Sequence, residues 1–354
     1  MGTKMDDAEA AAAWPAEDLE ELGHCPICGS SDRQAAYEGL IDRIFGAPGR
    51  WRLYRCSCSV VYLDPRPSEA SIHRAYASYH THDVVELALP WRTAGLGGAV
   101  RRGYLNGKYR YRMPEASLLG RLTWRFRRRA VRNLDFVIRH LGPPARSGAR
   151  ILDVGCGNGD FLKVAEDLGY SAVGIDPDVS AVALGRARGL DIRAGSLPGS
   201  NQPPGSFDHI FLSHVLEHLH HPRAALEEIL ALLAPGGRLW LSQPNLDAPG
   251  LARFGKDWRG LEPPRHLSLY NAVSLASLLT SVGFAEVSLL PAEEAALFYY
   301  RQSHSVKLGL NPYDGAEPPG WKEEVMPAAL AANRLARSRP DRGESLSMQA
   351  FKPS

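Results

Sequence analysis

The sequence contains no run of about 18 apolar residues, which is the length that a membrane-spanning helix needs, so we expect no segment to cross a bilayer. The amino-terminal residues also lack the pattern of a secretory signal, in which basic residues precede an apolar run. Acidic residues (Asp6, Asp7 and Glu9) lie there instead, beside a run of alanines. We therefore expect a cytoplasmic protein.

An excess of charge is likewise missing. The 41 basic and 39 acidic residues leave a formal net charge of +2, which argues against a dedicated nucleic-acid-binding protein without excluding one. Hydrophobic residues make up 44% of the chain, which is an ordinary share for a globular protein. The length of 354 residues suits one large domain with a smaller one.

Cysteine is scarce, and its distribution is uneven. Four of the five cysteines form two close pairs, Cys25 with Cys28 and Cys56 with Cys58. In a cytoplasmic protein such pairs are more often metal ligands than disulfides, and four soft ligands on two turns suit a structural zinc ion. The second pair is one residue shorter than the usual Cys-x-x-Cys knuckle, so the alternative is a ribbon that has lost its metal and persists through packing.

A glycine-rich stretch follows a short apolar run near the middle of the chain. Residues 151–154 predict a buried strand, and residues 161–165 predict the start of a helix. Between them, glycines alternate with other residues, at Gly155, Gly157 and Gly159. Such a turn lets a ligand approach the backbone closely, and the helix start leaves N–H groups unpaired. Asp153 comes just before the turn, and its carboxylate would repel a pyrophosphate but suit a cation.

This Asp-x-Gly-x-Gly-x-Gly pattern resembles the first motif of the class I S-adenosylmethionine-dependent methyltransferases. Four further segments within about 145–290 are similar to later motifs of that family, in the expected order: residues 173–176, 195–197, 207–214 and 232–239. The resemblance implies an α/β fold with a Rossmann-like seven-stranded sheet, in which 345–351 supplies the antiparallel last strand. Several methyltransferases also carry an amino-terminal zinc-ribbon-like β module, which we expect here, followed by a helical linker.

The resemblance implies S-adenosyl-L-methionine as the cofactor. Asp176 would accept hydrogen bonds from both ribose hydroxyls, since a carboxylate has enough acceptor positions for two donors. The residues expected around the cofactor are Asp153, Gly155, Cys156, Gly157, Asp176, Pro177, Ser196, Leu197 and Ser213. Ser196 stands where the family more often has Asp, and Cys156 is expected to be a small filler in the turn rather than a nucleophile.

Three histidines are candidates for a general base, because an unperturbed imidazole titrates near neutral pH. His214 and His218 follow the predicted fourth strand, and their spacing of four would put them on one face of a short helix. His266 lies in a segment similar to the one that covers the substrate in the family. In the alternative interpretation, Glu217 and His218 are structural and cap the helix.

The segment around His218 is also similar to the Glu-x-x-Glu-His sequence of some quinone-precursor O-methyltransferases, in which a divalent metal is a candidate cofactor. In this chain His214 replaces the first Glu of that pattern. Further along, Trp258 is a candidate wall of the acceptor pocket. Arg259 and Arg265 are candidates either for pairing with an anionic group or for ordinary surface positions.

Basic residues dominate the stretch 101–139, with twelve Arg or Lys against Glu115 and Asp135. Apolar residues near helical spacing predict an amphipathic basic helix: Leu118, Leu122, Phe126, Val131, Leu134 and Ile138. Three interpretations are open: a solvated face over the sheet, a site for an anionic substrate, and attachment to an anionic membrane surface. Just before this stretch, the aromatic and polar residues 76–82 are expected either to line a substrate cleft or to form an interdomain contact.

These patterns predict four regions. They are a disordered tail at 1–20, a zinc-ribbon-like module at 21–66, a helical linker or lid at 67–145, and a methyltransferase domain at 146–354 with an insertion at 292–344.

The sequence thus predicts a methyltransferase acting on an oxygen, or less readily a carbon, of a small molecule. The expected acceptor classes are sugars, glycan precursors, quinones and natural products, and an anionic acceptor is among the open interpretations. Two alternatives are a methyltransferase acting on RNA or protein and a non-catalytic module that binds the cofactor. Against the first, the Asn-Pro-Pro-Tyr-type signature of base methylation is absent after the predicted fourth strand.

Overall fold

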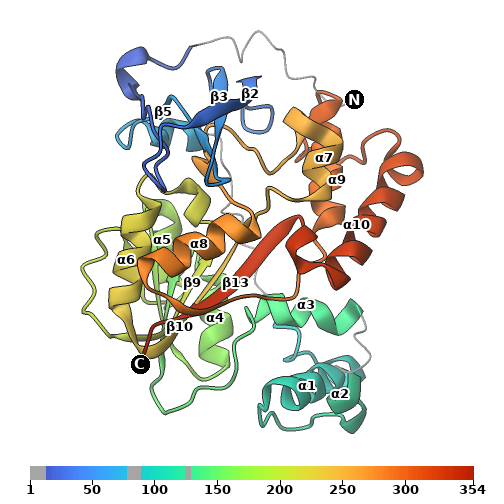
Figure 1. Ribbon diagram of the computed structural model, residues 1–354. Helices are drawn as coiled ribbons and strands as arrows, with labels where there is room; N and C mark the ends of the chain where they lie inside the picture. The colour runs from blue at the N-terminus through green and yellow to red at the C-terminus, as the bar shows by residue number, and fades with distance from the viewer. Residues whose placement is uncertain (1–12, 78–88, 124–128) are drawn as a thin grey trace. The chain divides into compact units, whose positions relative to one another are not determined.

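The computed structural model describes residues 13–77, 89–123 and 129–354 (Figure 1). Contacts divide the chain into two compact units. The first unit comprises residues 1–80, 212–230 and 241–354, and the second comprises residues 81–211 and 231–240. In the part of the chain that the structure describes, no helix has both the length and the apolar composition that a bilayer crossing needs.

Seven strands form one mixed sheet in the order β12-β13-β10-β9-β6-β7-β8. Their bounds are β6 Arg150–Val154, β7 Ser171–Asp176, β8 Ile192–Ala194, β9 Phe207–Ser213, β10 Leu233–Pro244, β12 Ala285–Leu289 and β13 Ser345–Phe351. β6, β7 and β8 run parallel, whereas β12 and β13 are antiparallel. Parallel strands in such folds are apolar because they are covered on both faces, and Ile151 and Leu152 are fully buried. The predicted α/β fold with an antiparallel last strand is confirmed.

Helices of the second unit begin at recognisable signals. α4 (Asp160–Asp167) starts after Gly159, and α5 (Val179–Ala187) starts at Asp178, whose carboxylate accepts hydrogen bonds from two backbone N–H groups of the first turn. The other helices described in this unit are α1 (Gly95–Tyr109), α2 (Leu118–Thr123) and α3 (Arg129–Val137).

The prediction of a single amphipathic helix within 101–139 is wrong. The described residues of this stretch belong to three helices, and the connection between α1 and α2 begins with a left-handed residue, Arg110. Of the six apolar positions, two are buried (Leu134 and Ile138), two are exposed (Leu118 and Leu122), and two fall outside the description (Phe126 and the side chain of Val131). Helical spacing therefore predicted burial correctly only for Leu134 and Ile138, at the end of the stretch.

A four-stranded antiparallel sheet lies in the first unit, in the order β11-β4-β3-β2. Its strands are β2 (Arg33–Leu40), β3 (Trp51–Cys56), β4 (Val61–Leu63) and β11 (Ser268–Leu269), and a separate pair joins β1 (Leu19–Glu20) to β5 (Arg66–Pro67). β11 lies far along the chain but pairs with β4, so that Ser268 is opposite Tyr62. A small amino-terminal β module is therefore present, and it is completed by a carboxyl-terminal strand.

The remaining helices described are α6 (Pro222–Leu232), α7 (Pro249–Phe254), α8 (Ala272–Val282), α9 (Ala296–Lys307) and α10 (Met326–Ser338). Short 3₁₀ or π turns occupy Ala16–Asp18, Ile72–Tyr76, Leu216–His218, Gly255–Asp257, Trp321–Val325 and Pro340–Arg342. α8 ends at Gly283, whose φ of 112° is left-handed, a conformation in which glycine commonly closes a helix. α9 and α10 lie within the stretch that we predicted as an insertion.

The hydrophobic core of the first unit begins within the predicted tail. Trp14 is 5% exposed, and its ring packs edge-on against Trp51, with ring centroids 5.5 Å apart. The same core includes residues of β3, α7, α9 and α10. The predicted disorder is therefore wrong for residues 13–20, where Trp14 is buried and a short 3₁₀ turn and strand β1 follow, while residues 1–12 of the predicted tail lie outside the described part of the chain.

Candidate functional site

The glycine turn after β6 is tied to the end of β7 by hydrogen bonds. The N–H groups of Gly155 and Cys156 donate to the carbonyl oxygen of Ile175 at 2.8 and 3.2 Å. The N–H of Gly157 donates to Oδ2 of Asp176 at 2.7 Å. The structure therefore brings Asp176 directly against the turn, although 18 residues separate Gly157 and Asp176 in the sequence.

Gly157 and Gly159 serve different purposes in this turn. Both are left-handed, with φ of 54° and 85°, a conformation that glycine adopts without steric cost. A Cβ on Gly159 would lie 2.5 Å from Cδ1 of Leu190, so this glycine lets the turn pack closely. A Cβ on Gly157 would meet no atom within 4 Å. The turn thus has one packed glycine and one glycine that faces open space, where a ligand can approach the backbone.

The carboxylate of Asp176 accepts hydrogen bonds at both of its oxygens. Its side chain also accepts a hydrogen bond at Oδ1 from the N–H of Asp178 at 2.9 Å. A carboxylate offers about four acceptor positions, which is enough for these backbone donors and for two hydroxyl groups. The same residue can therefore hold the turn and bind a diol.

Asp153, directly before the last residue of β6, forms a buried ion pair with Arg139. Burial raises the pKa of the Asp153 carboxyl group, and the charge of Arg139 opposes that shift. The guanidinium carbon of Arg139 lies 3.8 Å from the ring centroid of Phe161. Oδ2 of Asp153 is buried and has no hydrogen-bond partner among the described residues. A carboxylate oxygen in that state suits a ligand that is cationic or carries N–H groups.

Sequence reasoning missed Arg139, which it counted only as part of the basic stretch. Arg139 and His140 have left-handed φ of 48° and 54°, and surrounding contacts must sustain such a backbone. Arg238 of β10 supplies them, because its guanidinium donates to the carbonyl oxygens of His140 at 2.9 Å and of Arg139 at 3.3 Å. The side chain that meets Asp153 therefore comes from a turn after α3, and no local sequence signal marks that turn.

The other residues predicted at the cofactor differ in exposure. Cys156 is buried, burial raises the pKa of its thiol, and a Cβ on Gly174 would lie 2.5 Å from its Sγ, so it fills space as predicted. Leu197 is buried, Ser196 and Pro177 are exposed, and Ser213 is half-buried at the end of β9. Of these side chains, Cys156 contacts the turn directly, because its Sγ lies 3.6 Å from the carbonyl oxygen of Gly157.

His214 follows β9 with a left-handed φ of 55°. Its Nδ1 lies 3.2 Å from Oε1 of Glu217, and its side chain is 41% exposed while that of Glu217 is fully buried. Burial would lower the pKa of His214, but the hydrogen bond and charge of Glu217 raise it above the usual value of 6.5. The predicted sharing of one helical face with His218 is wrong, because the 3₁₀ turn begins only at Leu216.

His218 and His266 lie close together, with ring centroids 4.8 Å apart. Nδ1 of His218 lies 3.0 Å from the carbonyl oxygen of Arg265, and Nδ1 of His266 lies 2.8 Å from that of Gly260. A carbonyl oxygen only accepts, so each Nδ1 carries the proton and each Nε2 of the neutral ring has a lone pair. Burial lowers the pKa of His266 to about 4, which keeps it neutral at physiological pH.

Glu217 joins these two histidines in a set of ligand atoms within 4.8 Å of one another. Its Oε2 is buried and has no hydrogen-bond partner among the described residues. Histidines that bind a metal usually donate the other ring N–H to a carbonyl or carboxylate, as His218 and His266 do here. The three side chains could therefore hold a divalent cation.

Arg259 and Arg265, which we considered as anion-binding or surface residues, are instead buried and paired. Both arginines form ion pairs with Glu262, and Nη1 of Arg265 also lies 2.8 Å from Oδ2 of Asp42. Burial would raise the pKa of Glu262, but Arg259, His266 and Arg265 lower it well below its usual range. The network fixes the loop before β11 rather than offering a free guanidinium to an anion.

Trp258, the candidate wall of the acceptor pocket, is also buried in the interior of the first unit. It is 2% exposed, and its indole N–H donates to Oε2 of Glu344 at 2.9 Å. It borders a cavity of about 30 Å³, together with Asp42, Leu261 and Glu262. This volume holds about one water molecule, so the cavity is too small for a sugar or quinone. Of the predicted segment 76–82, only residues 76 and 77 are described, and Tyr76 places its hydroxyl 3.1 Å from Nδ1 of His218.

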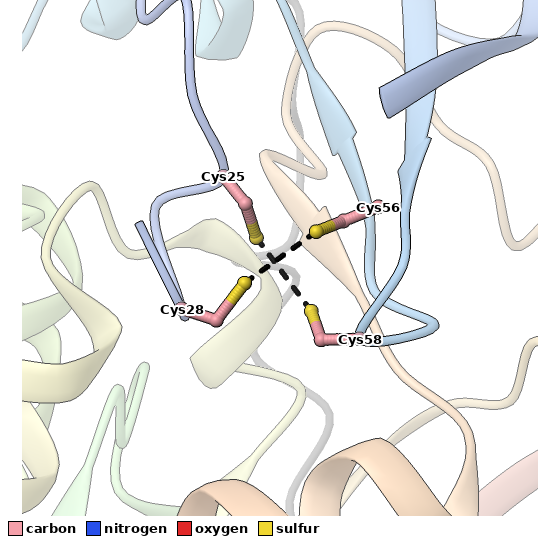
Figure 2. Close-up of side chains that lie close together, drawn as sticks. All are labelled: Cys25, Cys28, Cys56 and Cys58. Atoms are coloured by element: carbon pink, nitrogen blue, oxygen red, sulfur yellow. Dashed lines mark hydrogen bonds between the residues drawn. The ribbon is translucent and has the colours of Figure 1, made fainter. Parts of the chain in front are cut away.

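The four paired cysteines converge in the first unit, and their sulfur atoms point toward a common centre (Figure 2). Sγ of Cys25 lies 3.7 Å from Sγ of Cys58, and Sγ of Cys28 lies 3.4 Å from Sγ of Cys56. A tetrahedral zinc ion with Zn–S bonds of about 2.3 Å sets sulfur atoms about 3.8 Å apart. The shortened second pair therefore reaches the same geometry as the first, and the donor set fits zinc.

Comparison with known proteins identifies the segment that contains the glycine turn. Residues 123–289 match the family described as "Methyltransferase domain". The ubiquinone biosynthesis O-methyltransferase of Xanthomonas campestris is 36% identical over 119 residues, which cover 32% of this chain and 48% of that protein. The namesake from Xanthomonas euvesicatoria is 37% identical over 106 residues, covering 28% of this chain and 44% of that protein. The chain thus spans about half the length of the curated relatives it matches.

Among solved structures, a SAM-dependent methyltransferase from Archaeoglobus fulgidus is 17% identical, with a TM-score of 0.42, covering 70% of this chain and 97% of that one. The match of the family to residues 123–289 is consistent with the glycine turn, Asp176 and the sheet order described above. Residues 123–289 are therefore similar to a methyltransferase domain, and we propose that it is of the class I S-adenosylmethionine-dependent type.

Proposed function

We propose that the chain transfers a methyl group from S-adenosylmethionine to an oxygen, or less readily a carbon, of a small molecule such as a sugar, glycan precursor, quinone or natural product. One observation carries the proposal: the carboxylate of Asp176 is hydrogen-bonded to Gly157, beside open space at that glycine. The O-methyltransferases that are similar over about half their length support an oxygen acceptor.

In this proposal the second unit holds the cofactor, which supplies an activated methyl group on a cationic sulfur. Asp176 accepts the ribose hydroxyls, and the backbone at Gly157 contacts the methionine part. Asp153 supplies a buried negative charge near the turn, and Arg139 fixes that carboxylate. These residues orient the cofactor for in-line attack, which is the main contribution a protein makes to methyl transfer.

We propose His214 as the first candidate for the base that takes the acceptor's proton. It is the most exposed of the three predicted histidines, with 41% of its side chain accessible, and Glu217 contacts its Nδ1. His218 is the second candidate, through Nε2. His266 is the weakest, because burial lowers its pKa to about 4 and leaves it a poor proton acceptor at neutral pH.

We also propose that Cys25, Cys28, Cys56 and Cys58 bind one structural zinc ion, within a module that we place at 21–66. Free thiolate ligands persist in a reducing compartment, which favours a cytoplasmic location. Metal analysis of the purified protein should give one zinc per chain. Absence of zinc together with four titratable thiols would leave a ribbon held by packing alone.

The test of the cofactor site is calorimetric titration with S-adenosylhomocysteine. The wild-type protein should bind it, and Asp176→Ala should weaken binding by about 100-fold, since hydrogen bonds to a charged group contribute about 1.5–3 kcal/mol each. Asp191→Ala is the matched control, because Asp191 is an exposed acid that pairs only with Arg193 in the contacts described. Folded protein that does not bind, or unchanged binding by Asp176→Ala, would overturn the proposal. Binding without turnover on a broad acceptor panel would favour a non-catalytic module.

A further inference from the structure

Helices α1 and α2 pack through glycine. A Cβ on Gly103 would lie 2.2 Å from the carbonyl oxygen of Ser117, and a Cβ on Gly120 would lie 2.4 Å from that of Val100. A Cβ on Gly107 would lie 2.5 Å from the carbonyl oxygen of Arg121. The two backbones are therefore in direct contact, and Figure 1 shows the helices side by side. Glycine seams allow this close approach but bury little apolar area.

Because glycine occupies the inner face of α2, its leucines lie on the outer face. Leu118, Leu119 and Leu122 are 76%, 74% and 55% exposed. Their spacing along the helix brings the three side chains together on one side of α2. An amphipathic helix of a soluble domain normally buries its leucines, so this arrangement is inverted. Clustered exposed leucines mark an interaction surface.

The segment 89–123, which carries these leucines, is basic. Arg110, Arg112 and Arg121 are exposed and form no ion pair with any acid among the described residues. Glu115 is the only acid in 89–123, and its carboxylate lies 3.6 Å from a guanidinium nitrogen of Arg102. The surface thus combines an apolar centre with unneutralised positive charge.

We propose that Leu118, Leu119 and Leu122, with Arg121 of the same helix and the other exposed arginines of this segment, dock the protein on an anionic lipid surface. Leucines enter the boundary between headgroups and acyl chains, and arginines pair with the phosphates above it. A second copy of the chain fits poorly, because it would bring arginines against arginines. A nucleic acid would use the arginines but would leave the leucines in water. A lipid surface uses both, and it would place the enzyme where an apolar acceptor is found.

Vesicle flotation tests the proposal with the full-length protein. It should float with phosphatidylcholine vesicles that contain phosphatidylglycerol, float much less with pure phosphatidylcholine, and be released as salt rises. Leu118→Ser with Leu119→Ser should reduce the bound fraction about tenfold or more, and Arg121→Gln about fivefold, since each surface cation contributes about that factor. Val273→Ser, which changes an equally exposed residue (74%) on α8, should bind as the wild type does.

Two further measurements separate the outcomes. Binding of S-adenosylhomocysteine should be the same in all these variants, so a defect in the cofactor site cannot be mistaken for a defect in docking. The unfolding midpoint should also be unchanged, because the leucines are exposed. Wild-type protein that fails to float with anionic vesicles overturns the proposal. So does a wild-type dimer that the leucine substitutions convert to a monomer, which would assign the surface to a second copy.

Discussion

The glycine turn and the histidine cluster are built in opposite ways. The turn itself is one continuous stretch between β6 and α4, and the neighbouring strand β7 accepts its backbone hydrogen bonds through Ile175 and Asp176. The cluster of His218, His266 and Glu217 instead collects residues from two distant segments, and a buried network that reaches Asp42 holds it in place. The first kind of site can be recognised from a motif, whereas the second depends on the tertiary structure.

The two sites also handle buried charge differently. Asp153 has one counter-charge, Arg139, and one unpartnered oxygen. Glu262 is surrounded by Arg259, Arg265 and His266, so its pKa is lowered despite burial. A carboxylate with a single partner is sensitive to the loss of that partner, and a carboxylate with several is not. Substitutions can therefore test whether the two units respond separately.

The largest effect is expected at the cysteines. Cys58→Ser should abolish stoichiometric zinc binding, since apparent metal-binding free energies of small zinc modules are on the order of 10 kcal/mol. The unfolding midpoint should fall, but the affinity for S-adenosylhomocysteine should change less than about twofold, because the cofactor residues belong to the second unit. Metal analysis and calorimetry check this, and Cys156→Ser serves as the control that retains zinc. Loss of cofactor affinity in Cys58→Ser would show that the units are coupled.

Arg139→Met comes next. Removing one partner of a buried ion pair typically costs about 3–5 kcal/mol. Asp153 would then become protonated more readily, because burial and the charge of Asp176 would raise its pKa without opposition from Arg139. Denaturant unfolding measures the loss. The double variant with Asp153→Asn should recover part of the stability, since no charge is left unpaired. A single variant as stable as the wild type would mean that the ion pair is not formed in solution.

His214→Asn should lower turnover about 100-fold, which is within the range of general base catalysis, with little change in S-adenosylhomocysteine affinity. A base must be unprotonated, so the wild-type rate should rise with pH through a pKa above 6.5. Glu217→Gln removes the charge that raises this pKa, and the profile should therefore move toward lower pH. His221→Asn is the control, because that imidazole is exposed and pairs with Glu69. An unmoved profile would exclude His214 as the base.

The smallest effect is expected at the open glycine. Gly157→Ala should destabilise the fold by only about 1 kcal/mol, the usual cost of a Cβ in left-handed backbone, because no atom lies in the way. The substitution should reduce the affinity for S-adenosylhomocysteine more than it reduces stability, since the added methyl group occupies space that the ligand needs. Gly159→Ala should do the reverse and mainly reduce stability, because of its contact with Leu190. Equal effects of both substitutions on both quantities would contradict the division of roles.

The contrast between the sites explains how far the sequence could lead. The seven-stranded sheet, its antiparallel last strand and the importance of Asp176 followed from local motifs in a known order. Arg139 did not, because a left-handed turn after α3 aims it, and tertiary hydrogen bonds from Arg238 sustain that turn. The exposure of the leucines of α2 was also missed. Helical spacing shows that the leucines share a face, but it does not show whether that face or the opposite face, which carries Gly120, packs against a neighbour.

The pairing of β11 with β4 has a consequence for how this protein can be divided. Deleting the amino-terminal module would strip β11 of its neighbour and leave backbone groups without partners, while the loop that carries His266 would lose its anchor. Two segments that lie far apart in the sequence, β4 and β11, therefore depend on each other for their backbone hydrogen bonds. An ancestor that acquired the ribbon would have had to adapt a segment far downstream at the same time, so the two are expected to change together as the protein evolves.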